Sequence, residues 1–515
     1  MKVKKTDEKQ IKKWIEQRKS FVCFGAGNLL KELCKSVDLE KHIKWIVDNN
    51  QSLWNKKYKV VEKDIYVLAP NDERILQEEV IVLLTTTYHM QVAEQVEMLK
   101  NWKQVKEVYY FPTEADKCYN KMAWLWKNLK PQNKIIFRSG LARYVPGFDF
   151  SDNAKALFDY MLENEYNKEY KLIWYVHDPK EYSSYDNIKN VKFISYEWEK
   201  SKKIKDNIQY FYNLCTAKYL FFTDTHFWLR YCNKAQVRVN LWHGCGFKDR
   251  KTKNGPCGRN YDYMTVNSPM YADIHAEEFG VERKKIIDTG LAKQDLLFCP
   301  PNEKLCELLH VAEASKYVFW LPTFRMAAEG LERLNEYELD SETGLPIIDT
   351  IERAKELNAF LEKQDLTLII KLHPVQKNSI ISHLNLSRIS MLENRDIAQM
   401  GIQINTLLSK ADALISDYSS VAVDYMILDR PIAFILEDVE QYQKSRGFVF
   451  ENIYDYLPGA ELYTYEDLKK FIFEIANNQD STKEKRRELI KKMHSHQDGN
   501  SCSRILKSIG LNKEK

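Results

Sequence analysis

Two histidines follow directly after apolar runs that are typical of buried strands. His243 comes after residues 237–241, and His373 comes after residues 366–372. An imidazole exchanges protons near neutral pH, so either side chain is suited to accept a proton from a hydroxyl group or to protonate a leaving group. A lone histidine in this setting is more often structural. Here, however, a histidine follows a strand in each of two halves of the chain. Open parallel sheets bind ligands beyond the carboxyl ends of their strands, so this pair of positions favours acid–base chemistry.

A third polar segment, Asp417 to Ser420, opens an apolar helix that we expect to run to about residue 428. Asp417 or Ser419 at this position can cap the helix by accepting hydrogen bonds from first-turn N–H groups. The remaining N–H groups and the helix dipole also suit an anion such as a diphosphate, with the hydroxyls of Ser419 and Ser420 as further donors. Asp424, later on this helix, is placed to accept hydrogen bonds from ribose hydroxyls. The sequence alone does not decide whether this segment is only a helix cap or also binds a diphosphate.

Basic and hydroxyl side chains follow other predicted strands. Thr323 and Arg325 come after residues 317–321, and Lys371 lies two residues before His373. The guanidinium of an arginine binds phosphate through a planar fork, whereas a lysine acts as a point charge. Arg325 and Lys371 are therefore candidates for balancing the charge of a diphosphate.

Short strands alternate with amphipathic stretches along the whole chain, which is typical of βα units stacked around parallel sheets. Strands are predicted at residues 20–24, 43–47, 80–84, 107–111, 134–137, 172–176, 191–195, 219–223, 237–241, 263–266, 317–321, 366–372, 413–416 and 431–436. We expect a small Rossmann-like domain at 1–115, followed by two doubly wound domains at 116–299 and 300–515. These two would face each other across a cleft.

Composition is that of a multidomain globular protein. The 515 residues carry 77 Lys+Arg and 73 Asp+Glu, so the net charge of +4 does not by itself indicate a nucleic-acid partner, and we expect none. No apolar run approaches the roughly 18–20 residues of a membrane-spanning helix, and no signal sequence is evident. The ten cysteines form no CxxC pair, and His243, Cys245 and Cys257 match no zinc tetrad, so we expect reduced thiols, a cytoplasmic location and no metal.

The N-terminal segment contains part of a dinucleotide-binding fingerprint. Gly25 and Gly27 form a glycine turn after a strand, and Asp48 follows about twenty residues later. Leu30 occupies the place of the third glycine, where close helix–strand packing usually excludes a side chain. Gly25, Gly27 and Asp48 are therefore candidates for cofactor binding through an incomplete fingerprint. The alternative is a turn kept for folding or for recruiting partners, and a hydride-transfer hypothesis for the whole protein depends on this fragment.

Several motifs occur in a fixed order over roughly residues 134–505. They are Leu-Trp-His-Gly at 241–244, Leu-Pro-Thr-Phe-Arg at 321–325, Lys-Leu-His-Pro at 371–374, Ser-Asp-Tyr-Ser-Ser at 416–420, then Asp424, Tyr425 and Pro431, with support from 152–157, 446–448, 458–459 and 498–499. Together they resemble the CDP-glycerol glycerophosphotransferase family, the primases and polymerases of teichoic acids and related capsular polymers. Two segments depart from the family pattern, since Cys245 and Gly246 replace a Thr-Pro type pair and Lys293 replaces an arginine.

The resemblance implies an α/β fold with a GT-B-like pair of facing Rossmann-like domains. It also implies an enzyme that moves glycerol phosphate or ribitol phosphate from CDP-glycerol or CDP-ribitol to a hydroxyl of a teichoic acid or capsular polysaccharide, releasing CMP. In this scheme His243 is the general base, and His373 contacts the diphosphate and protonates the departing phosphate, although the two roles could be exchanged. The expected substrate-binding residues are Gly244, Thr323, Arg325, Lys371, Asp417, Ser419, Ser420 and Asp424.

Two other functions fit the same sequence: a GT-B glycosyltransferase that uses a nucleotide sugar, and a catalytically silent nucleotide-binding scaffold in capsule assembly. The family's acceptors are carried on lipids, so the resemblance implies peripheral contact with the inner face of the cell membrane. The candidate contact is a basic and aromatic helix containing Trp124 and Trp126, with Met122, Leu125 and Leu129 flanked by Lys121, Lys127 and Lys130. The alternative is that the tryptophans pack between domains.

Overall fold

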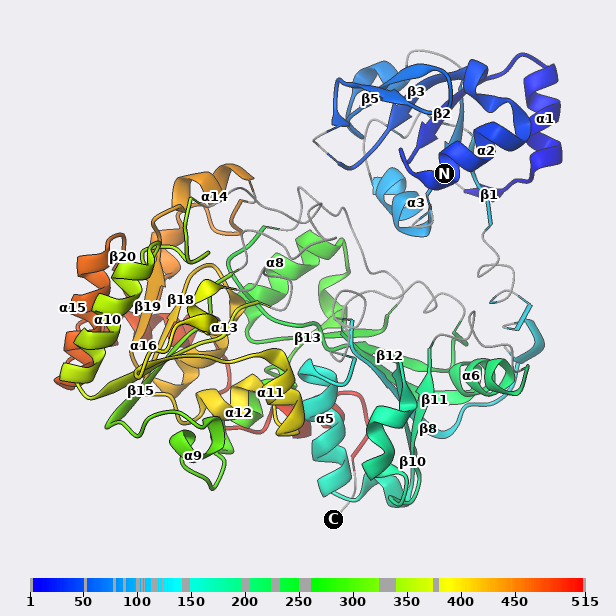
Figure 1. Ribbon diagram of the computed structural model, residues 1–515. Helices are drawn as coiled ribbons and strands as arrows, with labels where there is room; N and C mark the ends of the chain where they lie inside the picture. Colours follow the sequence, from blue (N-terminus) through cyan, green and yellow to red (C-terminus); the bar gives the residue numbers. More distant parts are fainter. Residues whose placement is uncertain are drawn as a thin grey trace.

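The structure is a computed structural model of the chain. It describes residues 3–512 except 51–52, 77–79, 87–88, 99–101, 103–104, 106, 113–118, 120, 123, 127, 141–148, 197–203, 224–231, 250–260, 324–339, 374–378 and 446. In these residues the strands form three sheets in which nearly all pairs are parallel, with helices packed against them (Figure 1). The predicted α/β class is confirmed.

The first sheet lies in the N-terminal segment and has the strand order β1-β7-β6-β2-β3-β5-β4. Its strands are β1 (Lys4–Lys5), β2 (Ser20–Phe24), β3 (Ile43–Val47), β4 (Lys57–Lys59), β5 (Asp64–Leu68), β6 (Val80–Leu84) and β7 (Val108–Tyr110), and its helices are α1 (Glu8–Glu16), α2 (Asn28–Val37) and α3 (His89–Met98). Only the β4–β5 pair is antiparallel among its described strands. The strands predicted at 20–24, 43–47 and 80–84 coincide with β2, β3 and β6.

The second sheet is entirely parallel in its described pairs and has the order β10-β9-β8-β11-β12-β13-β14. Its strands are β8 (Gln132–Arg138), β9 (Lys171–Val176), β10 (Val191–Ser195), β11 (Ala217–Phe222), β12 (Val237–Asn240), β13 (Tyr263–Val266) and β14 (Ile286–Asp288). Helices α5 (Asp152–Glu163), α6 (Ile204–Thr216) and α8 (Pro269–Phe279) and the 3₁₀ segment η10 (Ala292–Phe298) accompany it. We call this part the first lobe.

The third sheet, also parallel, has the order β17-β16-β15-β18-β19-β20. Its strands are β15 (Lys316–Trp320), β16 (Leu366–Ile370), β17 (Ile389–Met391), β18 (Ala413–Ser416), β19 (Ile432–Ile435) and β20 (Ala460–Leu462), and its helices are α9 (Leu305–Leu309), α10 (Ile351–Lys363), α11 (Asn394–Gln399), α12 (Ile404–Leu408), α13 (Ser420–Tyr425), α14 (Val439–Ser445), α15 (Tyr465–Ala476) and α16 (Lys483–Met493). We call this part the second lobe. Its strand order reverses between β15 and β18, the point at which doubly wound sheets bind ligands.

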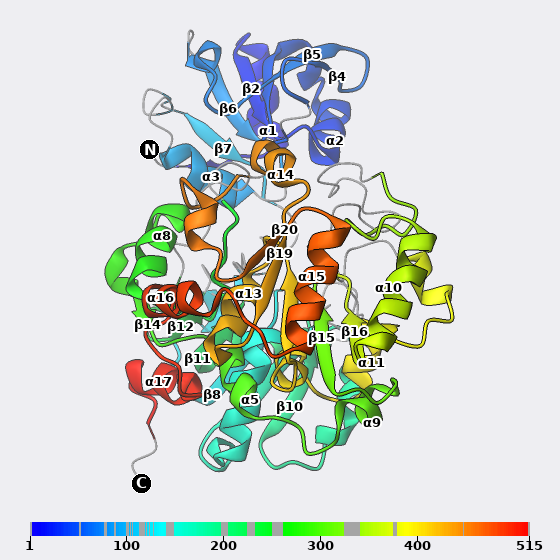
Figure 2. The same cartoon turned by 90° about the vertical axis from the view of Figure 1, so that its left-hand side faces the viewer.

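The chain returns to the first lobe after α16. Helix α17 (Ser501–Ser508) buries Cys502, Ile505 and Leu506 in the apolar core of the first lobe (Figure 2). The buried carboxylate of Asp295 caps this helix by accepting the N–H groups of Ser501 at 2.7 Å and Cys502 at 2.8 Å. The apolar face of α17, which lies after residue 300 in the sequence, thus packs against the earlier lobe.

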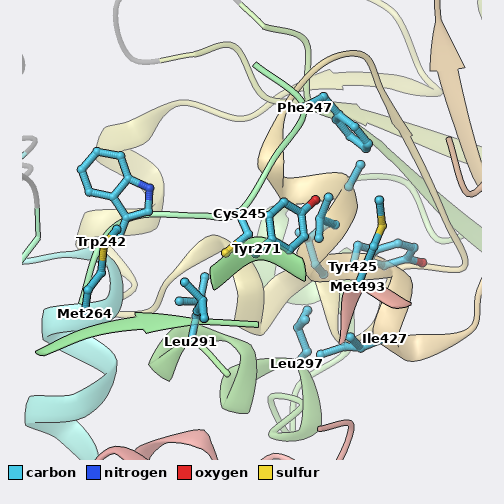
Figure 3. Packing of buried hydrophobic residues seen from close by; sticks show 14 of the residues in the cluster. Trp242, Cys245, Phe247, Met264, Tyr271, Leu291, Leu297, Tyr425, Ile427 and Met493 are labelled. Carbon is cyan, nitrogen blue, oxygen red and sulfur yellow. The ribbon is translucent and has the colours of Figure 1, made fainter. Parts of the chain in front are cut away.

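One apolar cluster runs through both lobes. Figure 3 shows Cys245 and Tyr271 of the first lobe in the same cluster as Tyr425 and Met493 of the second lobe. The backbone after the Trp-His-Gly motif at 242–244 also pairs with the second lobe. The carbonyl of Phe247 accepts a 2.8 Å hydrogen bond from the N–H of Val449. The facing domains that the sequence predicts are thus joined by packing and backbone pairing as well as by a linker.

Candidate active site

The loop that carries His243 has an unusual backbone conformation. Trp242 has φ of 50°, in the left-handed region that a bulky side chain rarely adopts. Its N–H donates to Asn240 Oδ1 at 2.9 Å, and its carbonyl accepts a 3.0 Å hydrogen bond from Asn153 Nδ2. A residue in this region costs on the order of 1–3 kcal/mol unless its surroundings over-determine it. Here neighbouring side chains fix the turn immediately before His243.

The imidazole of His243 rests on the indole of Trp242. Their ring centroids lie 3.9 Å apart with an interplanar angle of 32°, and Trp242 is fully buried. The His243 side chain itself is partly exposed. This stacking gives the ring a fixed face and leaves it accessible, as a group that exchanges protons with a substrate requires.

The glycine after His243 lies against the second lobe. A Cβ atom at Gly244 would fall 2.4 Å from Ser420 Oγ, and one at Gly246 would fall 3.0 Å from Ser420 Cβ. The distance at Gly244 is shorter than side chains tolerate, and the one at Gly246 is tight, so glycine at 244 is needed for the first-lobe loop to reach the start of α13. The structure therefore brings together Gly244 and Ser420, two predicted substrate-binding residues from different lobes.

Replacing Gly244 by alanine is expected to lower the catalytic rate constant by about 100-fold. The added methyl group must push the His243 loop away from Ser420, and displacement of a reacting group by about 1 Å has an effect of this size. Steady-state kinetics would measure the loss. The matched control is Ser420→Gly, which removes both atoms that the methyl group meets. The double variant should be more active than Gly244→Ala alone, and a double variant as inactive as Gly244→Ala would contradict the steric explanation.

Thr323 and Asp417 meet at the strand-order reversal of the second lobe. The fully buried carboxylate of Asp417 accepts the Thr323 N–H at 2.8 Å and the Thr323 hydroxyl at 2.5 Å. The helix cap is instead Ser419, whose Oγ accepts the N–H of Val421 at 3.5 Å. Asp417 therefore holds the loop after β15 to the loop after β18, and the cap interpretation applies to Ser419.

Basic side chains from both lobes gather beside Thr323. Lys248 of the first lobe donates to Thr323 Oγ1 at 3.3 Å. Burial, with the nearby charges of Lys248 and Lys371, lowers the pKa of His373 to about 3, and burial lowers the pKa of Lys371 to about 8. The charges of Lys248 and Lys371 thus act on His373, and two lysines near one imidazole suit an anion. The sequence did not single out Lys248, although it lies five residues after His243.

Arg325, the other predicted basic ligand, lies outside the described residues. Lys127, Cys257, Pro374 and Arg446 of the motifs and candidate segments do so as well. Among the residues that the structure describes, no group of three or more His, Cys, Asp or Glu side chains is arranged to hold a metal ion.

Asp424 is enclosed between the lobes. Its carboxylate is almost completely buried, with Oδ1 accepting a 2.7 Å hydrogen bond from Gln294 Nε2 and Oδ2 lying 3.2 Å from Lys293 Nζ. Burial disfavours the charge on Lys293, but Asp424 and Asp152 more than offset this and raise the pKa of the ammonium. The described partners of Asp424 are thus protein groups, and contact with a nucleotide ribose remains a prediction. Sequence reasoning missed Lys293 as a site residue, although its departure from the family arginine was a signal.

The glycine turn of the N-terminal segment is held by Asp48. Its Oδ2 accepts the N–H of Ala26 at 2.7 Å, and its Oδ1 accepts the N–H of Asn50 at 2.8 Å. A Cβ atom at Gly25 would lie 2.9 Å from the carbonyl oxygen of Thr85. These contacts explain Gly25 and Asp48 by folding alone, and cofactor binding by Gly25, Gly27 and Asp48 stays a prediction.

The sequence profile of the CDP-glycerol:poly(glycerophosphate) glycerophosphotransferase family matches residues 120–511. The chain belongs to this family. The resemblance drawn from the ordered motifs is therefore confirmed, as is the prediction that the protein is an enzyme of the polyol-phosphate transferase type.

Related proteins of this glycerophosphotransferase family act in teichoic acid synthesis. The chain is 23% identical over 482 residues to teichoic acid ribitol-phosphate polymerase TarL of Staphylococcus aureus, covering 88% of this chain and 76% of that protein. It is 25% identical over 420 residues to a teichoic acid glycerol-phosphate primase of Bacillus subtilis, covering 76% of this chain and 96% of that protein. The solved structure of the wall teichoic acid polymerase TagF is similar, with a TM-score of 0.56 at 21% identity over 82% of this chain and 98% of that chain. This likeness confirms the predicted GT-B-like fold.

Proposed function

We propose that the chain transfers glycerol phosphate or ribitol phosphate from the CDP-linked polyol to a hydroxyl of a teichoic acid or capsular polymer. The observation that carries this proposal is the meeting of the His243 loop with Ser420 and of Lys248 with the Thr323–Asp417 pair. The candidate proton acceptor and the candidate anion-binding groups thus come from two lobes and meet near one strand-order reversal, which supports the proposal. The names of the relatives, which specify both polyol phosphates, support either donor.

In the proposed reaction the acceptor oxygen forms a bond to the β-phosphorus of the donor. The bond from that phosphorus to the bridging oxygen breaks, and CMP leaves with the electron pair. His243 takes the proton of the acceptor hydroxyl, since its ring is accessible and held by Trp242. Such phosphoryl transfer depends mainly on positioning and on neutralising the phosphate oxygens.

The other basic groups serve the diphosphate in this proposal. Lys248 and Lys371 supply positive charge, and Ser419 and Ser420 supply hydroxyl donors. The negative charge of a bound diphosphate opposes the burial and repulsion that lower the pKa of His373, so donor binding is expected to bring a proton to this imidazole. His373 can then protonate the departing phosphate.

The decisive experiment offers the protein CDP-glycerol, CDP-ribitol, UDP-glucose and UDP-GlcNAc, each with a glycolipid acceptor, and identifies the nucleotide released. Release of CMP from a CDP-polyol is the expected result. Release of UDP would replace the proposal with a glycosyltransferase. Binding of a CDP-polyol without release of any nucleotide would favour the silent scaffold.

We further propose that the protein contacts a membrane surface through the helical residues 121–122 and 124–126 and residues 128–130 after them. Trp124 is 68% exposed, Leu125 49% and Leu129 40%, whereas Trp126 packs against Tyr212 at a ring-centroid distance of 6.2 Å. Lys121 and Lys130 flank these apolar side chains, which suits an anionic lipid surface. None of the described helices is both long enough and apolar enough to cross a bilayer.

Replacing Trp124 and Leu129 together by alanine is expected to reduce flotation with anionic liposomes several-fold, because the change removes apolar area that would enter the interface. The matched control is Phe473→Ala, which removes a similarly exposed apolar side chain from α15 in the second lobe. Equal flotation of the double variant and the wild type would exclude this segment as the membrane contact.

A further inference from the structure

The ammonium group of Lys293 joins the two lobes at the backbone of His243. Lys293 Nζ donates to the carbonyl oxygen of His243 at 2.6 Å, lies 3.2 Å from Asp424 Oδ2 and lies 3.7 Å from Asp152 Oδ1. Asp152 and Lys293 belong to the first lobe, and Asp424 belongs to α13 of the second lobe. The side chains of Asp152 and Asp424 are buried, and that of Lys293 is 13% exposed.

Neighbouring groups fix this ammonium from both sides. The backbone N–H of Lys293 donates to Asn153 Oδ1 at 3.0 Å, and the same asparagine donates to the carbonyl of Trp242. The next residue, Gln294, donates to the other oxygen of Asp424 at 2.7 Å. Consecutive side chains of η10 therefore hold one second-lobe carboxylate, while Asn153 ties the same segment to the turn before His243.

The charges of Lys293, Asp152 and Asp424 depend on one another. A buried ion is costly without a partner, so loss of Lys293 would leave Asp152 and Asp424 facing each other as like charges. Burial already raises the pKa of Asp152 to about 6, with Lys293 opposing the rise. Loss of Asp424 would instead weaken the tie between Lys293 and α13, the helix whose first residue touches Gly244.

We propose that Lys293 is a positioning residue, which holds the backbone of His243 in register with α13 through its contact with Asp424. This inference rests on the proposed function, in which His243 accepts the proton of the acceptor hydroxyl. It also assigns Asp424 a role between the lobes in place of the expected contact with the donor ribose. The cation thus acts on the reaction through the placement of His243, without touching substrate.

The test is a double-mutant cycle of Lys293→Met and Asp424→Asn. Each single variant should lower kcat by about 100-fold, the effect of a displacement of about 1 Å, while the KM for the CDP-polyol changes less than about twofold. The double variant should lose no more than the worse single variant, because both changes break one contact. Lys293→Arg, which keeps the charge, should recover part of kcat.

Two kinetic outcomes would overturn the proposal. Multiplicative losses in the double variant would show that Lys293 and Asp424 act separately. A large rise in donor KM with Asp424→Asn, absent from Lys293→Met, would return Asp424 to the ribose.

A second readout does not depend on turnover. Hydrogen exchange of the backbone amides at residues 241–246 should be faster in Lys293→Met than in the wild type, whereas exchange in β16 should stay the same. Unchanged exchange at 241–246 would overturn the positioning role. If the wild type releases no CMP from either donor, the proposed function fails, while the exchange comparison still decides whether Lys293 holds the loop. Lys293→Gln provides the same comparison should Lys293→Met not fold.

Discussion

Release of CMP from CDP-glycerol or CDP-ribitol is expected to fall by about 10²–10⁴-fold when His243 is replaced by alanine. The imidazole lies against Trp242 in a turn held by Asn153 and Asn240, so its loss removes the group that is placed to accept the proton in the proposed reaction. Affinity for the CDP-polyol should change little, since the basic cluster belongs to other residues. Single-turnover kinetics and calorimetric titration with the donor would measure the two effects separately.

The matched control is His383→Ala, which removes an exposed imidazole from the second lobe and should leave CMP release unchanged. A His243→Ala variant that keeps more than a tenth of the wild-type rate would contradict the general-base role. The same measurement on His373→Ala would then show whether the two histidines exchange roles. His373 is the group whose loss should also weaken donor binding, because it lies in the desolvated cluster with Lys248 and Lys371.

Replacement of Arg486 by methionine is expected to destabilise the second lobe by about 3–5 kcal/mol. The guanidinium is fully buried and lies 2.5 Å from Asp480 Oδ2 and 3.1 Å from Asp429 Oδ1. Methionine fills much of the same volume but leaves both carboxylates without this cation. Denaturant unfolding followed by tryptophan fluorescence would measure the loss.

Arg487 on the same helix offers a closely matched comparison. It also contacts Asp429, at 2.7 Å, but its side chain is 48% exposed. An exposed ion pair contributes about 0–1 kcal/mol, so Arg487→Met should have a small effect. Equal destabilisation by the two variants would show that burial of Arg486 is not what makes its ion pairs important.

The sequence predicts those strands that form a continuous apolar run. Buried runs such as Val80–Leu84 and Ala413–Ser416 are complete signals in themselves, because a strand covered by helices on both sides needs no alternation. The three-residue strands β14, β17 and β20 lie toward sheet edges and are too short to stand out. The partner of α17 could not be predicted, since an amphipathic helix shows which face is buried but not against what.

The candidate site likewise combines residues that a local sequence pattern reveals and residues that only the folded structure reveals. The positions of His243, His373 and Asp417 after strands could be predicted because each follows a recognisable apolar run, and a parallel sheet places such residues at its own carboxyl edge. Lys248 and Lys293 come from a loop and a 3₁₀ segment, and their importance depends on contacts across the lobes that no local pattern contains. Asp424 shows the converse, since its helical position suggests a ribose contact, which stays a prediction, whereas its contacts with Gln294 and Lys293 across the lobes could not be predicted from the helix.

The capping of α17 by Asp295 has a consequence for biosynthesis. Residues 501–511 complete a core whose other members precede residue 300, so the ribosome must translate the whole second lobe before that core can close. Domains usually fold one after another as they emerge. Here part of the apolar core of the earlier lobe stays uncovered until α17 is made. A premature stop codon after the second lobe would therefore destabilise the first lobe, although all the other residues of its core had been translated.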